Sequence, residues 1–280
     1  MPCEMILKTK WDEYRRVETN YWHSKYDIKS MKGNNSNVIS NRNIFVYWDK
    51  GFDKAPKVVQ ACYRRLQNYI PKDWTLVTLT EQNVSEYIKM PSFILDMIRG
   101  GQIFRANYSD ILRTALLYHY GGIWIDSTCF ITKDIPKEIL DEKLFMFSIR
   151  EIIPSTPYSF ENWFIRANQH DYVMGRVLEN MLCFFKQYPK PTQIYFVMYY
   201  ILTALYNHDE LARDIMNKIP FWSNLEPLQV CCLYGLEARI DEKLWNHIMK
   251  GCFVQKLTYK YHGKIEKNMT GTILSKILNN

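Results

Sequence analysis

Stretches with strand and helix periodicity follow one another in the first part of the chain. Residues 43–48 (NIFVYW) are β-branched and aromatic, which predicts a strand. In 55–71 the apolar residues share one helical face, and Pro56 lies near the start, where helices accept proline. The β-rich run 74–80 predicts a second strand, and 81–88 predicts a short helix. This alternation is typical of an α/β fold with a mainly parallel sheet.

The next apolar stretch predicts a helix that turns into a buried strand. Residues 109–122 have the helical pattern and end in glycine, a common C-cap. Residues 123–125 (IWI) predict a short buried strand, and Asp126 follows at its carboxyl end. Ligands of open α/β sheets bind beyond the carboxyl ends of the strands, so Asp126 is a candidate ligand-binding group.

The second half of the chain reads as one further strand followed by mostly helical sequence. Residues 143–149 predict the strand, and 172–188 and 194–206 predict the clearest helices. The run 194–206 is apolar but shorter than the roughly 20 residues that span a bilayer, so we expect a buried core helix. No internal repeat is visible.

The N-terminal region differs from the rest. Residues 1–40 are polar with scattered aromatics, show helical spacing of Trp11, Tyr14 and Val17, and end in KGNNSN, a turn-rich stretch typical of a linker. We therefore expect an N-terminal helical and polar segment, 1–40, and a single domain over 41–280.

The positive charge is concentrated at the C-terminal end. The 280 residues carry a net charge of +7. Residues 243–280 hold seven lysines and one acid, Glu266, so this segment supplies +6 and the body is nearly neutral. The 47% hydrophobic content excludes a disordered chain, and 11 Gly and 11 Pro without period exclude collagen.

The cysteines and the N-terminus indicate a reducing compartment. Seven cysteines form no C-x-x-C spacing, so free thiols are expected rather than disulfides or a zinc site. The first residues contain no apolar run typical of a signal peptide. A cytoplasmic protein is the expectation.

One group of residues has the types and spacing expected of a catalytic or binding site. Ser109-Asp110-x-x-Arg113 is followed by a helical stretch, Tyr-Gly-Gly, an apolar strand and Asp126. Asp110 and Arg113 are three residues apart and share a helix face, where an acid and a guanidinium can hold sugar hydroxyls. Asp126 offers a hard oxygen to magnesium or manganese.

The constellation resembles the capsular polysaccharide synthesis proteins, relatives of the family-32 glycosyltransferases and, more distantly, of the clostridial glucosylating toxins. The core of the resemblance is RANYSDILRTALLYHYGGIWIDSTCFIT at 105–132. The resemblance spans roughly 43–260. Its other segments are 43–66, 74–94, 161–182 and 255–260.

This resemblance implies a GT-A-like (Rossmann-like) fold with extra helices in the C-terminal half, a nucleotide-sugar donor and a divalent metal, manganese or magnesium. Asp126 stands at the first acid of the DxD motif and would bind the metal. Asp110 and Arg113, with Ser109, would contact the donor sugar, and Asn162 lies in a similar sugar-contact segment. We expect Asp126, Asp110 and Arg113 to be the catalytic residues.

Aromatic and basic residues complete the implied donor site. Tyr47 and Trp48 close the first strand, where relatives hold the base, and an aromatic ring there stacks on it. We expect the basic C-terminal segment to supply Lys256, His262 and Lys264 to the donor diphosphate and to close as a lid.

The chain departs from the pattern at three positions. Thr128 stands where the DxD motif has its second acid, in a D-S-T variant similar to that of capsular members. Tyr199 stands where relatives often carry Asp, and Gln255 where some carry His.

The implied reaction moves a hexosyl group, expected from UDP, to a saccharide hydroxyl with retention of anomeric configuration. Capsule-type acceptors are lipid-linked, so a peripheral position at the inner face of the plasma membrane is expected. No nucleic-acid motif is present, and no nucleic-acid partner is expected.

Plainer interpretations stay open for these residues. Asp110 and Arg113 also fit a helix ion pair, Asp126 a turn cap, and Tyr47, Trp48 and Trp163 plain core packing. A haloacid-dehalogenase-like phosphatase and a basic module for nucleic acid or acidic lipid are the alternative functions.

Overall fold

A five-stranded sheet forms the centre of the fold. The computed structural model describes residues 3–18, 25–35, 38–149, 160–187, 194–260 and 270–279. The strand order is β2-β1-β3-β6-β5. The strands are β1 (Asn43–Tyr47), β2 (Thr75–Leu79), β3 (Gly122–Ile125), β5 (Leu144–Ser148) and β6 (Phe160–Ala167).

Four of these strands point in one direction. β1 pairs in parallel with β2 and with β3, whereas β6 is antiparallel to both β3 and β5. β6 is thus the one reversed strand of this sheet, and the prediction of an α/β fold with a mainly parallel sheet is confirmed.

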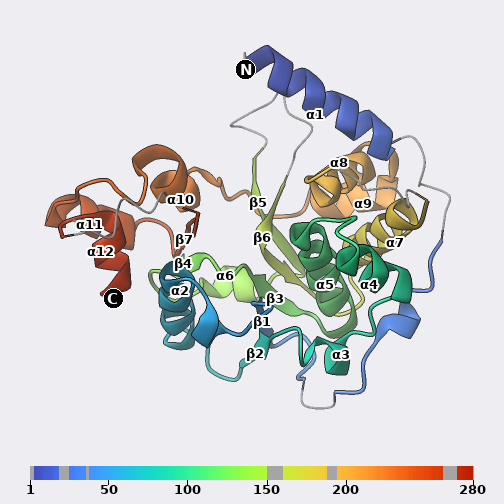
Figure 1. Ribbon diagram of the computed structural model, residues 1–280, viewed down its shortest axis with the longest axis horizontal. Helices are drawn as coiled ribbons and strands as arrows, with labels where there is room; N and C mark the ends of the chain where they lie inside the picture. The colour runs from blue at the N-terminus through green and yellow to red at the C-terminus, as the bar shows by residue number, and fades with distance from the viewer. Residues whose placement is uncertain are drawn as a thin grey trace.

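Helices cover both faces of the sheet (Figure 1). In β1 and β3, neighbouring residues enter two different cores, one on each face. Phe45 and Trp124 face the larger core, with α5 (Arg105–Tyr120), α7 (Tyr172–Gln187) and α8 (Val197–His208). The opposite face, with Ile44 and Ile123, packs against two other helices. These are α2 (Lys57–Gln67) and α6 (Lys137–Leu140).

A C-terminal unit covers the outer side of α2. Strand β7 (Val254–Lys256) pairs antiparallel with β4 (Cys129–Ile131) in a second, two-stranded sheet. Apolar residues of α2 and β4 form a third core with this unit, on the left of Figure 1. The other elements of the unit are α10 (Leu225–Leu228), η3 (Gln229–Tyr234), α11 (Glu242–Lys250) and α12 (Ile273–Leu278).

The sequence after 149 is mostly helical where it is described, as predicted, but the prediction did not include β6 and β7. All eight residues of β6 are buried, because helices or loops cover both of its faces. A strand buried on both faces lacks the apolar–polar alternation that identifies strands in a sequence.

The N-terminal helix packs on the body of the protein. α1 (Cys3–Glu18) contacts α8, and Tyr14 and Val17 are buried in the larger core. The predicted linker is also held in place where it is described. Its Gly33 N–H donates to the Tyr87 carbonyl over 2.7 Å.

Predicted and observed element boundaries agree within a few residues, with one difference that affects the site. Helix α5 begins at Arg105 rather than 109, since the Asn107 side chain accepts from the Phe104 N–H at its start. Ser109 is therefore one turn inside the helix. The remaining elements are η1 (Lys29–Met31), η2 (Phe52–Lys54), α3 (Val84–Tyr87), α4 (Ser92–Arg99) and α9 (Glu210–Met216).

The apolar run 194–206 lies within the larger core as α8, as expected. Across the described parts of the chain, helices of the length and hydrophobicity required to cross a bilayer are absent.

Candidate active site

The turn between α5 and β3 places Asp126 at the sheet edge. Gly121 and Gly122 both have positive φ, 64° and 118°. A Cβ on Gly122 would lie 2.3 Å from the Asn43 carbonyl oxygen of β1. The paired glycines thus allow a sharp reversal and a close approach of two backbones. β3 then carries Asp126 beyond its carboxyl end, as predicted.

Both carboxylate oxygens of Asp126 are engaged. Oδ1 accepts from the Trp124 indole N–H over 2.8 Å and lies 3.3 Å from Nη2 of Arg113. Oδ2 accepts from the Lys256 ammonium over 2.6 Å. Two cations and one indole therefore hold this carboxylate in a single orientation.

Arg113 connects α5 to β3 and β6. Its Nη2 lies 3.2 Å from Asp110 Oδ1, and its Nη1 donates to the Asn162 carbonyl. Its guanidinium also lies over the Trp124 ring, 5.1 Å from the centroid. The predicted shared face of Asp110 and Arg113 is confirmed, but the pair is buried and bridges to Asp126.

Asn162 belongs to the same cluster. Its Nδ2 donates to Asp110 Oδ1 over 3.0 Å. Ser109, the first residue of the predicted motif, accepts from Arg113 Nη2 at its Oγ over 3.3 Å. The structure therefore brings Ser109, Asp110, Arg113 and Asn162 together, as one polar cluster next to Asp126.

Lys256 reaches the cluster from the C-terminal unit. It ends β7, opposite Cys129 of β4, and its ammonium also donates to Thr128 Oγ1 over 2.8 Å. This position agrees with the prediction that Lys256 joins the site. Lys256 lies, however, in a paired strand rather than in a separate lid. His262 and Lys264, the other two predicted diphosphate contacts, lie outside the described residues.

Burial and ion pairing shift the pKa values of Asp110 and Asp126 in opposite directions. Burial alone would raise the pKa of Asp126, but Lys256 and Arg113 hold it below its usual value. Burial raises the pKa of Asp110 to about 7, with Arg113 opposing and Asp126 adding to the shift. Asp126 is thus the carboxylate that stays ionised between Arg113 and Lys256.

A buried carboxylate that the sequence analysis did not single out lies one residue before Asn162. Glu161 Oε2 accepts from the Tyr199 hydroxyl over 2.8 Å, and Oε1 accepts from Asn224 over 2.6 Å. Burial raises the pKa of Glu161, while these two hydrogen bonds and Lys256 oppose the shift. Tyr199, which stands where relatives often carry Asp, therefore places a phenol against a carboxylate of the site. The signal for it was an acid next to Asn162 within the largely apolar segment 160–165.

An exposed aromatic lies beside the cluster. Tyr195 is 51% exposed, and both Asp110 and Asp126 contribute to the raised pKa of its phenol after burial. Its ring lies 5.8 Å from that of Phe104, itself 42% exposed. These two rings form an accessible aromatic surface next to the buried charges.

Tyr47 and Trp48 do not form a single platform. Tyr47 packs against the larger core and its ring lies 6.2 Å from Tyr108, whereas Trp48 packs on the opposite face of the sheet. Trp48 is edge-on to Tyr259 at 5.3 Å, three residues after Lys256. Only Trp48 is thus in contact with the segment that carries Lys256. Trp163 stacks on Phe147 in the core, which supports its plainer interpretation.

The donor set around Asp126 does not fit a divalent ion. Magnesium and manganese prefer several oxygen ligands, supplied by one or two unpaired carboxylates together with water and substrate phosphates. Here one carboxylate is already paired with two cations. Among the described residues, no group of three His, Cys, Asp or Glu side chains could hold a metal. The metal implied by the resemblance stays a prediction, and no step below depends on it.

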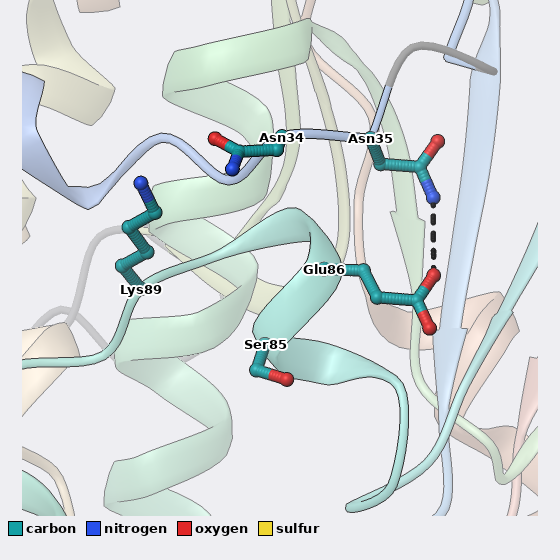
Figure 2. Close-up of a pocket in the computed structure, with 5 residues that line it drawn as sticks. All are labelled: Asn34, Asn35, Ser85, Glu86 and Lys89. Carbon is teal, nitrogen blue, oxygen red and sulfur yellow. Dashed lines mark hydrogen bonds between the residues drawn. The ribbon is translucent and has the colours of Figure 1, made fainter.

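A pocket of about 360 Å³ lies elsewhere, between the predicted linker and α3 (Figure 2). Its lining is polar, and Asn35 Nδ2 donates to Glu86 Oε2 over 3.4 Å. No predicted site residue lines it, so we assign it no part in the chemistry.

Curated relatives share parts of the chain. It is 27% identical to the O-glycosyltransferase braB of Annulohypoxylon truncatum over 49% of this chain and 32% of that protein. It is 33% identical to the glycosyltransferase afumC of Aspergillus fumigatus over 30% of this chain and 24% of that protein. The chain thus spans about a third or less of the length of these two relatives.

Two solved structures are similar in part. The PaToxG glycosyltransferase aligns with 76% of this chain and 83% of its own, at 15% identity and a TM-score of 0.43. The glycosyltransferase GlyE of Streptococcus pneumoniae aligns with 86% of this chain and 62% of its own, at 10% identity and a TM-score of 0.38.

The match to a family profile is far more extensive. It covers residues 7–277, and so includes the SDxxR helix, Asp126, Asn162 and Lys256. The chain belongs to the capsular polysaccharide synthesis protein family.

Proposed function

We propose that this protein is a glycosyltransferase that moves a hexosyl group from a nucleoside-diphosphate sugar, with UDP as the expected nucleotide, to a saccharide hydroxyl. The observation that carries the proposal is the convergence of Arg113 and Lys256 on Asp126 at the carboxyl end of β3. Family membership and the names of the curated relatives support the same class of reaction.

The two cations suit the charge that develops in such a reaction. The bond between the anomeric carbon and the diphosphate oxygen breaks, and its electron pair stays on that oxygen. The acceptor hydroxyl oxygen forms the new bond to the anomeric carbon, and its proton passes to the released diphosphate or to solvent. Fixed cations stabilise the leaving diphosphate without reorganising during the reaction.

Each remaining residue has a place in this scheme. Asp110 and Asn162 bind hydroxyls of the donor sugar, and Arg113 orients Asp110 while facing the diphosphate. Trp48 is the better candidate for stacking on the base, because it contacts the segment after Lys256. We expect retention of configuration, as implied by the resemblance to the family-32 enzymes.

A capsule or other surface polysaccharide is the proposed destination. Its acceptors are lipid-linked, so we propose a peripheral contact with the inner face of the plasma membrane. The exposed lysines Lys243, Lys250 and Lys260 and the partly exposed Trp11 support such a contact.

The geometry disfavours the phosphatase alternative. A phosphatase of that class needs a free aspartate oxygen to attack phosphorus, whereas each oxygen of Asp126 is hydrogen-bonded to a cation or an indole. The same contacts serve a transferase, where Asp126 positions cations.

The experiment is a turnover assay over a panel of nucleoside-diphosphate sugars. Release of the nucleoside diphosphate is measured with and without a saccharide acceptor, and product configuration is read by NMR. Lys256→Met should lower kcat/KM by about 10²–10³-fold, as loss of one charge-stabilising group does. Lys137→Met, on the exposed side of α6, is the matched control and should retain wild-type rates. Phosphate release from simple monoesters instead of donor turnover would overturn the proposal.

A further inference from the structure

Thr128 and Asp126 share one cation. The Lys256 ammonium lies 2.6 Å from Asp126 Oδ2 and 2.8 Å from Thr128 Oγ1. These two side chains occupy the first and third positions of the D-S-T turn, the positions from which a D-x-D motif holds its metal. The ammonium therefore occupies the location between them that the resemblance assigns to a divalent ion.

The position of Lys256 is fixed by the fold. Its backbone is in register with Cys129 in the β4–β7 pair, and the Leu257 N–H donates to the Thr128 carbonyl over 2.9 Å. The Lys256 side chain is only 20% exposed. The contact is thus built by strand pairing on both sides of the turn and does not depend on a flexible surface lysine.

The charge balance favours the ammonium over a divalent ion. Asp126 already faces Arg113 at 3.3 Å and Lys256 at 2.6 Å. A further charge of +2 on the same carboxylate would lie within a few ångströms of both cations and would be repelled by each of them. Thr128 contributes a neutral oxygen where a second carboxylate would offset this repulsion.

The ammonium retains capacity for a substrate. A lysine has three N–H donors and no acceptor. Two donors reach Asp126 and Thr128, and among the described residues the third has no acceptor. A phosphate oxygen is a strong acceptor for such a charged donor.

We propose that Lys256 takes the place of the divalent metal, so that its ammonium, held by Asp126 and Thr128, binds the donor diphosphate and glycosyl transfer needs no divalent cation. This inference rests on the proposed function. The bond changes are those given above: the electron pair of the broken bond goes to the diphosphate oxygen, and Lys256 remains protonated throughout. Lys256 is then a catalytic residue, and Asp126 and Thr128 position it.

The test measures binding of two probes, so it does not require the true donor. Calorimetry follows inorganic pyrophosphate with EDTA and, separately, with Mn²⁺. Electron paramagnetic resonance follows Mn²⁺ alone through the loss of its free-ion signal. We expect the wild-type protein to bind pyrophosphate in EDTA, to bind it no more tightly when Mn²⁺ is present, and, without pyrophosphate, to leave the Mn²⁺ signal unchanged.

Three variants sharpen the result. Lys256→Ala should weaken pyrophosphate binding in EDTA by about 10- to 100-fold, the value of a hydrogen bond to a charged group. Lys256→Arg keeps a cation and should retain most of the binding. The double variant Lys256→Ala with Thr128→Asp removes the ammonium and adds a carboxylate, so it should gain Mn²⁺ binding. Lys137→Ala is the surface control.

The outcomes separate this inference from the proposed function. Pyrophosphate binding that appears only with Mn²⁺, or a Mn²⁺ site in the wild type that Asp126→Asn removes, would overturn the inference and leave a metal-dependent transferase. Absence of pyrophosphate binding under both conditions would remove the diphosphate site, and the proposed function would fail with the inference. The two wild-type measurements decide the question even if a variant does not fold.

Discussion

Lys256 Nζ and Asp126 Oδ2 lie 2.6 Å apart although 130 residues separate them in the sequence. This contact joins the carboxyl end of β3, in the central sheet, to β7, in the C-terminal unit. The site therefore depends on the packing of that unit as well as on the SDxxR helix.

The Asp126–Lys256 pair should show measurable coupling in stability. Lys256→Ala removes one partner but leaves Asp126 with Arg113, so we expect a loss of about 1–3 kcal/mol, less than for a fully buried pair. Adding Asp126→Asn to the Lys256→Ala variant should lower the free energy of unfolding only a little further. Urea unfolding of the two single variants and the double variant measures the coupling. Additive effects would contradict a direct interaction.

Asp110 should make stability depend on pH. Its pKa is about 7 in the folded protein against a usual 3.8. Between these values the folded protein holds a proton that the unfolded chain has released. This contribution is fully present below about pH 3.8 and is lost as the pH rises through 7. Asp110→Asn should therefore show a weaker fall in the free energy of unfolding over this interval, as measured by urea titration. If the free energies of unfolding of the wild type and the variant change in parallel with pH, the raised pKa of Asp110 is contradicted.

Tyr199 and Tyr200 offer a matched pair. Tyr199 donates to Glu161 in the site over 2.8 Å, and Tyr200 donates to Glu13 of α1 over 2.7 Å. Each change to Phe should cost about 1.5–3 kcal/mol, the value of a hydrogen bond to a charged group. The Tyr199 hydroxyl also lowers the pKa of Glu161, so only Tyr199→Phe should move the pH profile of donor turnover to higher pH. An identical profile in both variants would assign Glu161 a purely structural role.

Gly122 should tolerate no side chain. A Cβ there would lie 2.3 Å from the Asn43 carbonyl, and the backbone has a φ of 118°. We expect Gly122→Ala to lose about 3 kcal/mol or more, from strain plus overpacking. Gly101, with a φ of 66° and nothing within 4 Å of a Cβ, is the control for backbone strain alone. Its change to Ala should cost about 1–2 kcal/mol. Thermal unfolding compares the two, and equal losses would contradict the clash.

Local patterns were enough to predict one half of the site. Asp110 and Arg113 share a helix face because of their spacing, and Asp126 follows a strand that the sequence marks clearly. These relationships span few residues, so periodicity and turn chemistry determine them. The fold class followed from the same alternation of strands and helices.

Contacts between distant segments were harder to predict. Glu161 was missed because β6 is buried on both faces and shows no alternation, so its acid did not stand out as a strand residue. Lys256 was assigned to the diphosphate, but its ion pair with Asp126 depends on the pairing of β4 with β7, which no local signal specifies. Tyr47 and Trp48 were grouped by adjacency, although neighbouring strand residues face opposite sides of a sheet.

The pairing of β4 with β7 also sets the order in which the site can be completed during synthesis. A ribosome has produced Asp110, Arg113, Asp126 and Asn162 well before it adds Lys256. Until β7 pairs with β4, Asp126 lacks the second of its two cations. The C-terminal unit therefore supplies the last charged group of the site, after the residues of the SDxxR helix and the central sheet.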